Sequence, residues 1–208
     1  AEQFFERTKT TFGFANRSGG KTRAVAILNV ADMFFKPGVE ICSAGAIQEQ
    51  ANRAHEYLTD MLTKPPQASY VEVLLRSRVR LVNGSVAQII TGSYHGLNSK
   101  HPEKFRCDEI ELLHPTLLQE ALSQSQSRGE YQAQDTFTST RKFPAGTVQK
   151  LLNEAEMRNV KVMPWCIFEV LERCTRHCRN DPIHGDCAAY SRLNKDGNME
   201  IYVVEPWR

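Results

Sequence analysis

Apolar residues along this chain follow two alternating spacings. Short apolar runs, such as residues 39–43 and 79–82, have the length and composition of buried strands. Between residues 46 and 62, apolar side chains recur every three or four positions, which places them on one face of a helix. Because strand and helix signals keep alternating, the pattern predicts an α/β fold in which helices cover both faces of a sheet.

Turn signals separate the expected elements. Pro37-Gly38 and Pro65-Pro66 follow the first two predicted helices, and Asn83-Gly84 is typical of a tight hairpin turn. We expect strands at residues 11–14, 39–43, 70–75, 79–82, 85–91, 105–108, 134–140 and 160–163. We expect helices at residues 22–35, 46–62, 115–125 and 146–158. No apolar stretch approaches the roughly 20 residues of a membrane span, so no membrane partner is predicted.

The most informative motif joins the first predicted strand to the first predicted helix. Residues 15–22 read Ala-Asn-Arg-Ser-Gly-Gly-Lys-Thr. This is close to the P-loop pattern of Gly, four residues and then Gly-Lys-Ser/Thr, with Ala15 in place of the first glycine. In such a loop, backbone N–H groups at the helix N-terminus bind phosphate. The expected nucleotide-binding residues are Ser18, Gly19, Gly20, Lys21 and Thr22.

Three side chains of this loop have separate expected roles. Lys21 would reach the terminal phosphates of a nucleotide and assist catalysis, and the Thr22 hydroxyl would hold Mg²⁺. Arg17 lies inside the loop, where its guanidinium can brace the γ-phosphate during catalysis. The alternatives are an ordinary glycine turn before a helix and, for Arg17, an exposed loop arginine.

An acidic pair follows the short apolar run at 105–107, which Arg106 interrupts. Asp108 can hold Mg²⁺ through its water shell, and Glu109 can take a proton from an attacking water. Ligands of open α/β sheets gather at the carboxyl ends of the strands, which favours this position. The alternative is a solvated turn that carries two acidic side chains.

Small hydroxyl residues end the predicted strand at 134–140. They are Thr138, Ser139 and Thr140. Beside a γ-phosphate, such residues can sense hydrolysis and pass the change on. By composition alone, the segment is a threonine-rich strand.

Taken in order, these motifs resemble the ATPase domain of the large terminase subunit, the DNA-packaging motor of tailed bacteriophages. The resemblance rests on residues 17–22, 43–51, 96–113, 138–142 and 165–170, and it covers nearly the whole chain. It implies a P-loop NTPase fold of the RecA-like (ASCE) kind, with a mainly parallel sheet and flanking helices. It also implies that Lys21, Thr22 and Asp108 bind ATP and Mg²⁺, and that Glu109 is the catalytic base.

The same resemblance implies partners and a location. Thr138, Ser139 and Thr140 would couple ATP hydrolysis to the movement of double-stranded viral DNA. Such motors act as homo-oligomeric rings with a portal protein and a small terminase subunit. They work in the cytoplasm of the infected bacterial host, on the prohead during packaging. The family also uses an arginine from the neighbouring subunit, for which Arg80 and Arg106 are candidates.

Composition and cysteine usage add two constraints. The 208 residues carry a formal net charge of +2, so a general polyanion-coating surface is not predicted. Thiols gather near the end of the chain, and their density predicts a Zn²⁺ site. The candidate ligands are Cys174, Cys178 and Cys187, with Cys166 or one of the histidines His177 and His184 as the fourth. An iron–sulfur cluster is an alternative for the same thiols. A further alternative is a short helical tail with scattered buried thiols.

These expectations divide the chain into an ATPase domain at 1–165 and a Cys-rich tail at 166–208. The 35 residues after residue 173 are too few for the nuclease domain that large terminase subunits usually carry, so nuclease activity is not expected. The Cys-rich tail at 166–208 is then expected to be a linker toward a nuclease domain that these residues do not include. Two other functions remain open: another P-loop DNA-dependent ATPase, such as a helicase core, and a zinc-bound nucleic-acid-binding module without ATPase activity.

Overall fold

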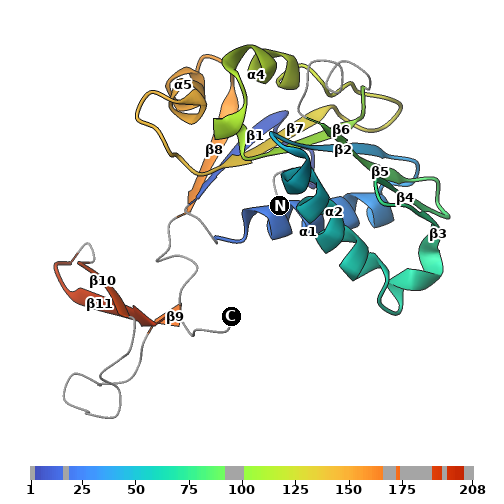
Figure 1. Cartoon of the computed structure of the whole chain (residues 1–208), viewed down its shortest axis with the longest axis horizontal. Coiled ribbons are helices and arrows are strands. Elements are labelled where there is room, and N and C mark those ends of the chain that lie inside the picture. Colours follow the sequence, from blue (N-terminus) through green and yellow to red (C-terminus); the bar gives the residue numbers. More distant parts are fainter. Residues whose placement is uncertain are drawn as a thin grey trace, which may run out of the picture. The chain divides into compact units, whose positions relative to one another are not determined.

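The structure is a computed structural model of the chain, and it describes residues 3–15, 19–91, 101–165, 172–173, 189–193 and 196–203. Contacts divide the chain into two compact units, Ala1–Pro164 and Trp165–Arg208. An eight-stranded sheet forms the centre of the first unit, and a separate three-stranded sheet belongs to the second (Figure 1).

Strands and helices alternate along the first unit, as the apolar pattern predicts. The helices are α1 (Lys21–Phe35), α2 (Gln48–Leu62), η1 (Gln67–Tyr70), η2 (Ile110–Leu112), α4 (Pro115–Ala121) and α5 (Thr147–Glu154). The strands are β1 (Thr10–Ala15), β2 (Glu40–Gly45), β3 (Val71–Leu74), β4 (Arg78–Leu81), β5 (Val86–Thr91), β6 (Lys104–Asp108), β7 (Gln134–Ser139) and β8 (Val160–Trp165). Each of them overlaps an element expected from the sequence, apart from the short η1 and η2 turns.

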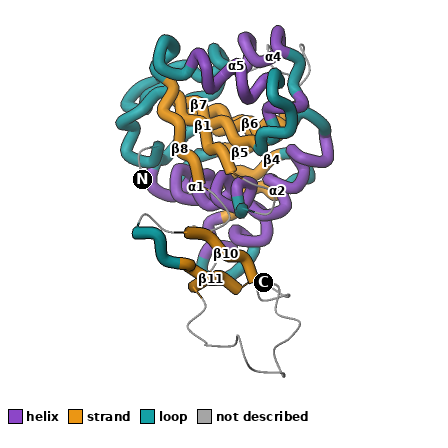
Figure 2. Tube along the Cα trace, turned by 90° about the vertical axis from the view of Figure 1, so that its left-hand side faces the viewer, coloured by secondary structure: helices purple, strands orange, loops and turns teal. Residues whose placement is uncertain are grey.

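The large sheet is mainly parallel, which confirms the predicted fold class. Its strand order is β3-β4-β5-β2-β6-β7-β1-β8. The five strands from β5 to β1 pair in parallel, whereas β3 and β4 form an antiparallel hairpin at one edge. Helices α1 and α2 cover one face of this sheet and α4 and α5 cover the other (Figures 1 and 2). No helix among the described residues is long and apolar enough to cross a bilayer.

Side chains of β6 alternate between the two faces of the sheet. Phe105 and Cys107 belong to the apolar core that α4 and α5 cover. Lys104, Arg106 and Asp108 have the opposite orientation, because successive strand residues point to opposite faces. All five residues are buried, so Arg106, which interrupts the apolar run in the sequence, does not interrupt the strand.

Arg106 is fully buried beneath α1, where three polar side chains surround it. Its Nε donates to Asn29 Oδ1 at 3.0 Å, one terminal nitrogen donates to Thr136 Oγ1 at 2.7 Å, and the other pairs with Asp32. An arginine that acts on a neighbouring subunit must reach the surface. Arg106 is therefore wrong as a candidate for that role, because its guanidinium is enclosed within its own chain.

Helix α5 ends before the predicted boundary, but its turns continue toward it. After Glu154, Arg158 N donates to the Glu154 carbonyl, and Val160 N then donates to the Ala155 carbonyl at 2.8 Å. Asn159 has a φ of 53°, in the left-handed region. This combination is a helix C-terminal motif that reverses the chain into β8.

The second unit contains strands that the sequence did not predict. They are β9 (Glu172–Arg173), β10 (Ala189–Leu193) and β11 (Met199–Val203), and they pair in the antiparallel order β10-β11-β9. The alternative of a short helical tail is wrong for these residues. The candidate zinc ligands Cys166, Cys174, Cys178 and Cys187 lie outside the described residues.

Candidate active site

The carboxyl ends of three parallel strands meet at one edge of the large sheet. Strand β7 lies between β1 and β6, with Ser139 opposite Phe14 and Thr138 opposite Asp108. Residues that follow these strands are therefore neighbours in space although they are far apart in sequence. This edge is where an open α/β sheet builds its ligand site.

Helix α1 begins at this edge, directly after the glycine-rich loop. Its first residue is preceded by Gly20, whose φ of 77° lies in the left-handed region that favours glycine. No described side chain caps the helix, and its first turn contains no acidic residue. Its N-terminal N–H groups and the positive end of its dipole therefore face the site, where they favour an anion.

Lys21 is buried between the glycine-rich loop and the end of β7. Its Nζ donates to Thr140 Oγ1 at 2.8 Å and to the Ala15 carbonyl oxygen at 3.4 Å. Burial lowers the pKa of Lys21 below its ordinary value, and the nearby Lys142 acts in the same direction, while Glu109 and Asp108 oppose the shift. The ammonium thus lies in a partly dehydrated site where an additional anion would stabilise it.

Asp108 joins the loop, β6 and β7 through its carboxylate. Its Oδ2 accepts a hydrogen bond from Thr22 Oγ1 at 2.5 Å, and its Oδ1 accepts one from Thr138 Oγ1 at 2.6 Å and one from Glu109 N at 2.9 Å. Carboxylate and hydroxyl oxygens are the hard ligands that Mg²⁺ prefers, and Mg²⁺ retains several waters when bound. Thr22 and Asp108 therefore fit such an ion.

Glu109 lies beside Asp108 and forms an ion pair within the site. Its Oε2 is 3.0 Å from Lys142 Nζ, and both side chains are about a quarter exposed or less (20% and 24%). The backbone of Glu109 has a φ of 55°, a conformation that non-glycine residues rarely adopt. Backbone strain of this kind is common at functional sites.

These residues line one cavity of about 580 Å³. Its walls also include residues that the sequence argument did not single out. They are Arg23 on α1, Gln50, Arg53 and Tyr57 on α2, and Lys142 after β7. The sequence does indicate that the α2 residues act together, because the spacing of Gln50, Arg53 and Tyr57 places them on one face of the helix. Four basic and two acidic side chains line the cavity, so its lining favours an anionic ligand.

The structure brings together most of the residues expected to act. Lys21, Thr22, Asp108 and Glu109 line the cavity with Gly19 and Gly20. Thr138 and Thr140 contact it through Asp108 and Lys21, whereas the Ser139 hydroxyl accepts a hydrogen bond from Glu111 N at 3.1 Å. Arg17 and Ser18 lie outside the described residues.

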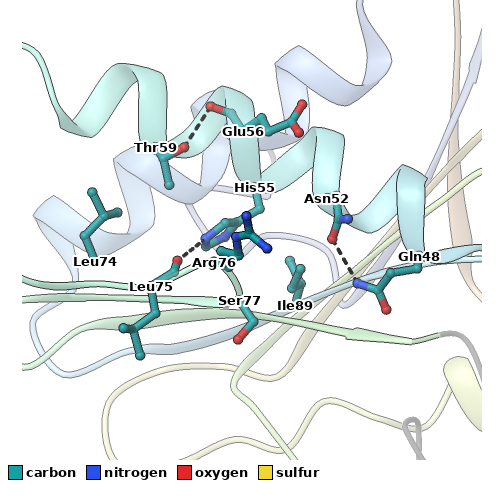
Figure 3. A pocket seen from close by; sticks show the side chains of 10 residues that line it. All are labelled: Gln48, Asn52, His55, Glu56, Thr59, Leu74, Leu75, Arg76, Ser77 and Ile89. Atoms are coloured by element: carbon teal, nitrogen blue, oxygen red, sulfur yellow. Dashed lines mark hydrogen bonds between the residues drawn. The ribbon is translucent and has the colours of Figure 1, made fainter.

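A second cavity, of about 650 Å³, lies along another face of α2 (Figure 3). Asn52, His55 and Glu56 line it from the helix, and Arg76 and Ile89 line it from the sheet side. His55 is buried, with its Nε2 at 3.0 Å from the Leu75 carbonyl oxygen. None of the described residues with an expected role in catalysis or nucleotide binding lines this cavity.

Comparison with known proteins shows similarity at the level of structure. No protein-family model matches the chain, and no curated protein does. The large terminase of a thermophilic bacteriophage superposes with a TM-score of 0.63 at 13% identity, covering 82% of this chain and 43% of that one. The HK97 bacteriophage large terminase matches with a TM-score of 0.61 at 15% identity, covering 75% and 35%.

A third solved structure is the N-terminal domain of the DNA packaging ATPase from bacteriophage phi29. It matches with a TM-score of 0.52 at 15% identity, covering 74% of this chain and 84% of that domain. The chain has the fold of a large-terminase ATPase domain. Structures of the thermophilic-phage terminase in complex with ATP-γ-S and with ADP share this terminase-type fold. The chain spans less than half of the length of the large terminases that it matches.

Proposed function

We propose that this chain is an ATP hydrolase that acts as the motor domain of a large terminase subunit and moves double-stranded viral DNA. One observation carries the proposal: the hydrogen bond between Thr22 and Asp108, which joins the glycine-rich loop to the acidic pair at a single cavity. The terminase-type fold supports it independently.

In this proposal, the loop and α1 bind the nucleotide phosphates. Backbone N–H groups of Ser18, Gly19 and Gly20 donate to phosphate oxygens at the helix N-terminus. Lys21 exchanges its hydrogen bond to Thr140 for one to the terminal phosphates, and Arg17 braces the γ-phosphate from the same loop. Thr22 and Asp108 hold Mg²⁺, which, when bound, neutralises charge on the phosphate oxygens.

Glu109 is the proposed general base. It accepts a proton from a water molecule whose oxygen forms a bond to the γ-phosphorus. The bond to the β–γ bridging oxygen breaks, and its electron pair leaves with ADP. Lys21 and Arg17 stabilise the charge that develops on the phosphoryl oxygens. The proposal is supported by the position of Glu109, which lines the same cavity as Lys21 and Asp108.

Thr138, Ser139 and Thr140 are the proposed coupling residues. Thr138 donates to Asp108 and Thr140 accepts from Lys21, so two of these side chains contact groups that hold the phosphates and the metal. A change at the γ-phosphate would alter both hydrogen bonds and so shift the end of β7. Movement of this strand end is the proposed link between hydrolysis and DNA translocation.

The proposed assembly is a homo-oligomeric ring on double-stranded DNA, with a portal protein and a small terminase subunit as partners. It would act in the cytoplasm of an infected bacterium, at the prohead. Arg80 remains the candidate for an arginine supplied to a neighbouring subunit. It lies on β4 with about half of its side chain exposed (47%), and its ion pair with Glu72 at 3.0 Å can be exchanged for a new partner.

Two variants test the ATPase proposal. We expect Lys21→Ala to abolish detectable ATP binding, because it removes the cation from the phosphate cradle. We expect Glu109→Gln to bind ATP but to hydrolyse it about 100-fold or more slowly, because the amide cannot accept the proton. Equilibrium nucleotide binding and phosphate release, measured with and without double-stranded DNA, separate the two effects.

The matched control is Lys150→Gln, which removes an exposed lysine of α5 far from the loop in sequence. It should bind and hydrolyse ATP as the unaltered chain does. Unchanged hydrolysis in Lys21→Ala would remove the glycine-rich loop from the mechanism. Full turnover in Glu109→Gln would assign the base to another residue.

A further inference from the structure

Lys142 is the one basic residue of the cavity lining that pairs with the proposed base. Its Nζ lies 3.0 Å from Glu109 Oε2, and Lys142 lines the same cavity as Lys21. Since Glu109 must contact the attacking water, which in turn lies beside the γ-phosphate, an ammonium this close to Glu109 is also within reach of the terminal phosphate.

The backbone from which Lys142 extends is held by a buried carboxylate. Glu111 Oε1 accepts hydrogen bonds from Lys142 N at 3.1 Å and Phe143 N at 2.9 Å, and its Oε2 accepts one from Val148 N at 2.7 Å. Gly146 approaches so closely that a Cβ there would lie 2.5 Å from Glu111 Oε1. The loop after β7 is thus anchored, and movement of Lys142 is confined to its flexible side chain.

The charges that line the cavity favour movement of the Lys142 side chain when an anion binds. Lys142 and Lys21 line the same cavity, so their two positive charges repel each other in the absence of a ligand. In the nucleotide-free chain, Lys21 donates a hydrogen bond to Thr140 and Lys142 pairs with Glu109. A triphosphate between them would give both cations a stronger partner than the ones they now have.

We propose that Lys142 is a ligand of the terminal phosphate and that its departure from Glu109 activates the base. In the nucleotide-free chain Lys142 pairs with Glu109. With a triphosphate in the cavity, its ammonium pairs with a γ-phosphate oxygen, and Glu109 is released to accept a hydrogen bond from the attacking water. A diphosphate lacks this group, so the pair forms again after product release. The inference rests on the proposed ATPase function.

The first experiment compares ATP-γ-S and ADP affinities for Lys142→Gln and Lys142→Arg, with Lys150→Gln as the control. Loss of a charge-assisted contact should weaken ATP-γ-S binding about 10-fold or more in Lys142→Gln. ADP affinity should change by less than about 2-fold, since ADP lacks the contacted group. Lys142→Arg should keep most of the ATP-γ-S affinity. Thermal unfolding of each variant shows whether it is folded.

The second experiment is a double-mutant cycle with Glu109→Gln. Because binding must break the Lys142–Glu109 pair, Glu109→Gln should tighten ATP-γ-S binding about 3-fold or more when Lys142 is present. That gain should vanish in the double variant with Lys142→Gln. If simple repulsion between Glu109 and phosphate were the cause, the gain would persist, and the proposal would be overturned.

The outcomes distinguish a failure of this inference from a failure of the proposed ATPase function. A chain that binds no ATP-γ-S in its unaltered form overturns both. A chain that binds and hydrolyses ATP, but whose Lys142→Gln variant loses equal affinity for ATP-γ-S and ADP or none for either, overturns only the assignment of Lys142.

Discussion

Buried carboxylates in this protein have quite different surroundings. Asp108 and Glu111 each accept three hydrogen bonds from other residues. The bonds of Asp108 connect β6 to α1 and β7, and those of Glu111 connect η2 to the segment after β7 and to α5. Asp135, at the start of β7, is equally inaccessible, and burial raises its pKa to about 6 against opposing contributions from Ser125, Lys9 and Arg106. At neutral pH the charged carboxylate of Asp135 therefore destabilises the folded state.

Asp135 leads to a prediction about pH and stability. Because its pKa is higher in the folded chain than in the unfolded one, the folded state holds the proton more tightly. The stability gained from this tighter proton binding is fully present below about pH 4, and it is lost as the pH rises to about 6. Asp135→Asn should thus raise the free energy of unfolding at pH 7.5 by up to about 3 kcal/mol.

Urea unfolding of the unaltered chain and of Asp135→Asn at pH 5 and pH 7.5 measures this difference. The advantage of the variant should be larger at the higher pH. Equal differences at the two pH values would show that the carboxylate does not titrate in this range.

At the scale of elements, α1 packs on the sheet through a row of polar and charged side chains as well as through apolar residues such as Ala26 and Met33. Asn29 and Asp32 of α1 and Lys36, the residue directly after it, recur at helical spacing, and they contact residues of the sheet and the N-terminal segment. Lys104 extends the network by pairing with Glu6 at 2.5 Å. Burial lowers the pKa of Lys104 to about 8, which shows how strongly this layer is dehydrated.

The ion pair between Arg106 and Asp32 should be costly to break from one side. Asp32→Leu leaves the fully buried Arg106 guanidinium without its counter-ion and should destabilise the chain by about 3–5 kcal/mol. Arg106→Met should cost less, because Asp32 keeps its ion pair with Lys36 at 2.8 Å. The double variant should recover much of that loss, because both charges are then absent. Urea unfolding of the four proteins gives the interaction energy.

Lys64→Met is the matched control for this cycle. Lys64 pairs with Asp60 at 2.6 Å, but both side chains are 63% exposed. A solvated pair of this kind contributes about 1 kcal/mol or less. If Arg106→Met and Lys64→Met had similar effects, burial would not be what makes the Arg106 pair important.

At the scale of the whole chain, the division into two units makes a prediction about the Cys-rich tail. Residues 1–165 contain the complete eight-stranded sheet and the cavity. A chain that ends at residue 165 should therefore bind ATP-γ-S with the affinity of the full chain. The proposed zinc site belongs to the tail, so metal analysis should find about one Zn²⁺ in the full chain and none in the shortened one.

Two variants sharpen that experiment. Cys174→Ser should lower the zinc content of the full chain, whereas Cys42→Ser should not, since Cys42 is a buried residue of β2. Zinc retained by the shortened chain would contradict the tail assignment. Loss of ATP-γ-S binding on shortening would show that the tail contributes to the nucleotide site.

Local sequence patterns predicted the elements of the large sheet, because a strand or a helix depends on the spacing of apolar residues within itself. They also placed Lys21 and Thr22 after a strand and at the start of a helix, and Asp108 at the end of another strand. Arg106 was misjudged for the same reason. It was a candidate for the arginine supplied to a neighbouring subunit, and the partners that bury it, Asn29 and Asp32, lie more than 70 positions away in the sequence.

By itself, the sequence determined the mainly parallel α/β fold and the types of residues available to bind phosphate and Mg²⁺. Only the tertiary structure decided that β7 lies between β1 and β6, that α2 contributes Arg53 and Tyr57 to the cavity, and that Lys142 pairs with Glu109. The physical reason is distance along the chain. Strand order and the packing of helices on a sheet depend on the fit between surfaces formed by separate segments, and no local spacing records that fit.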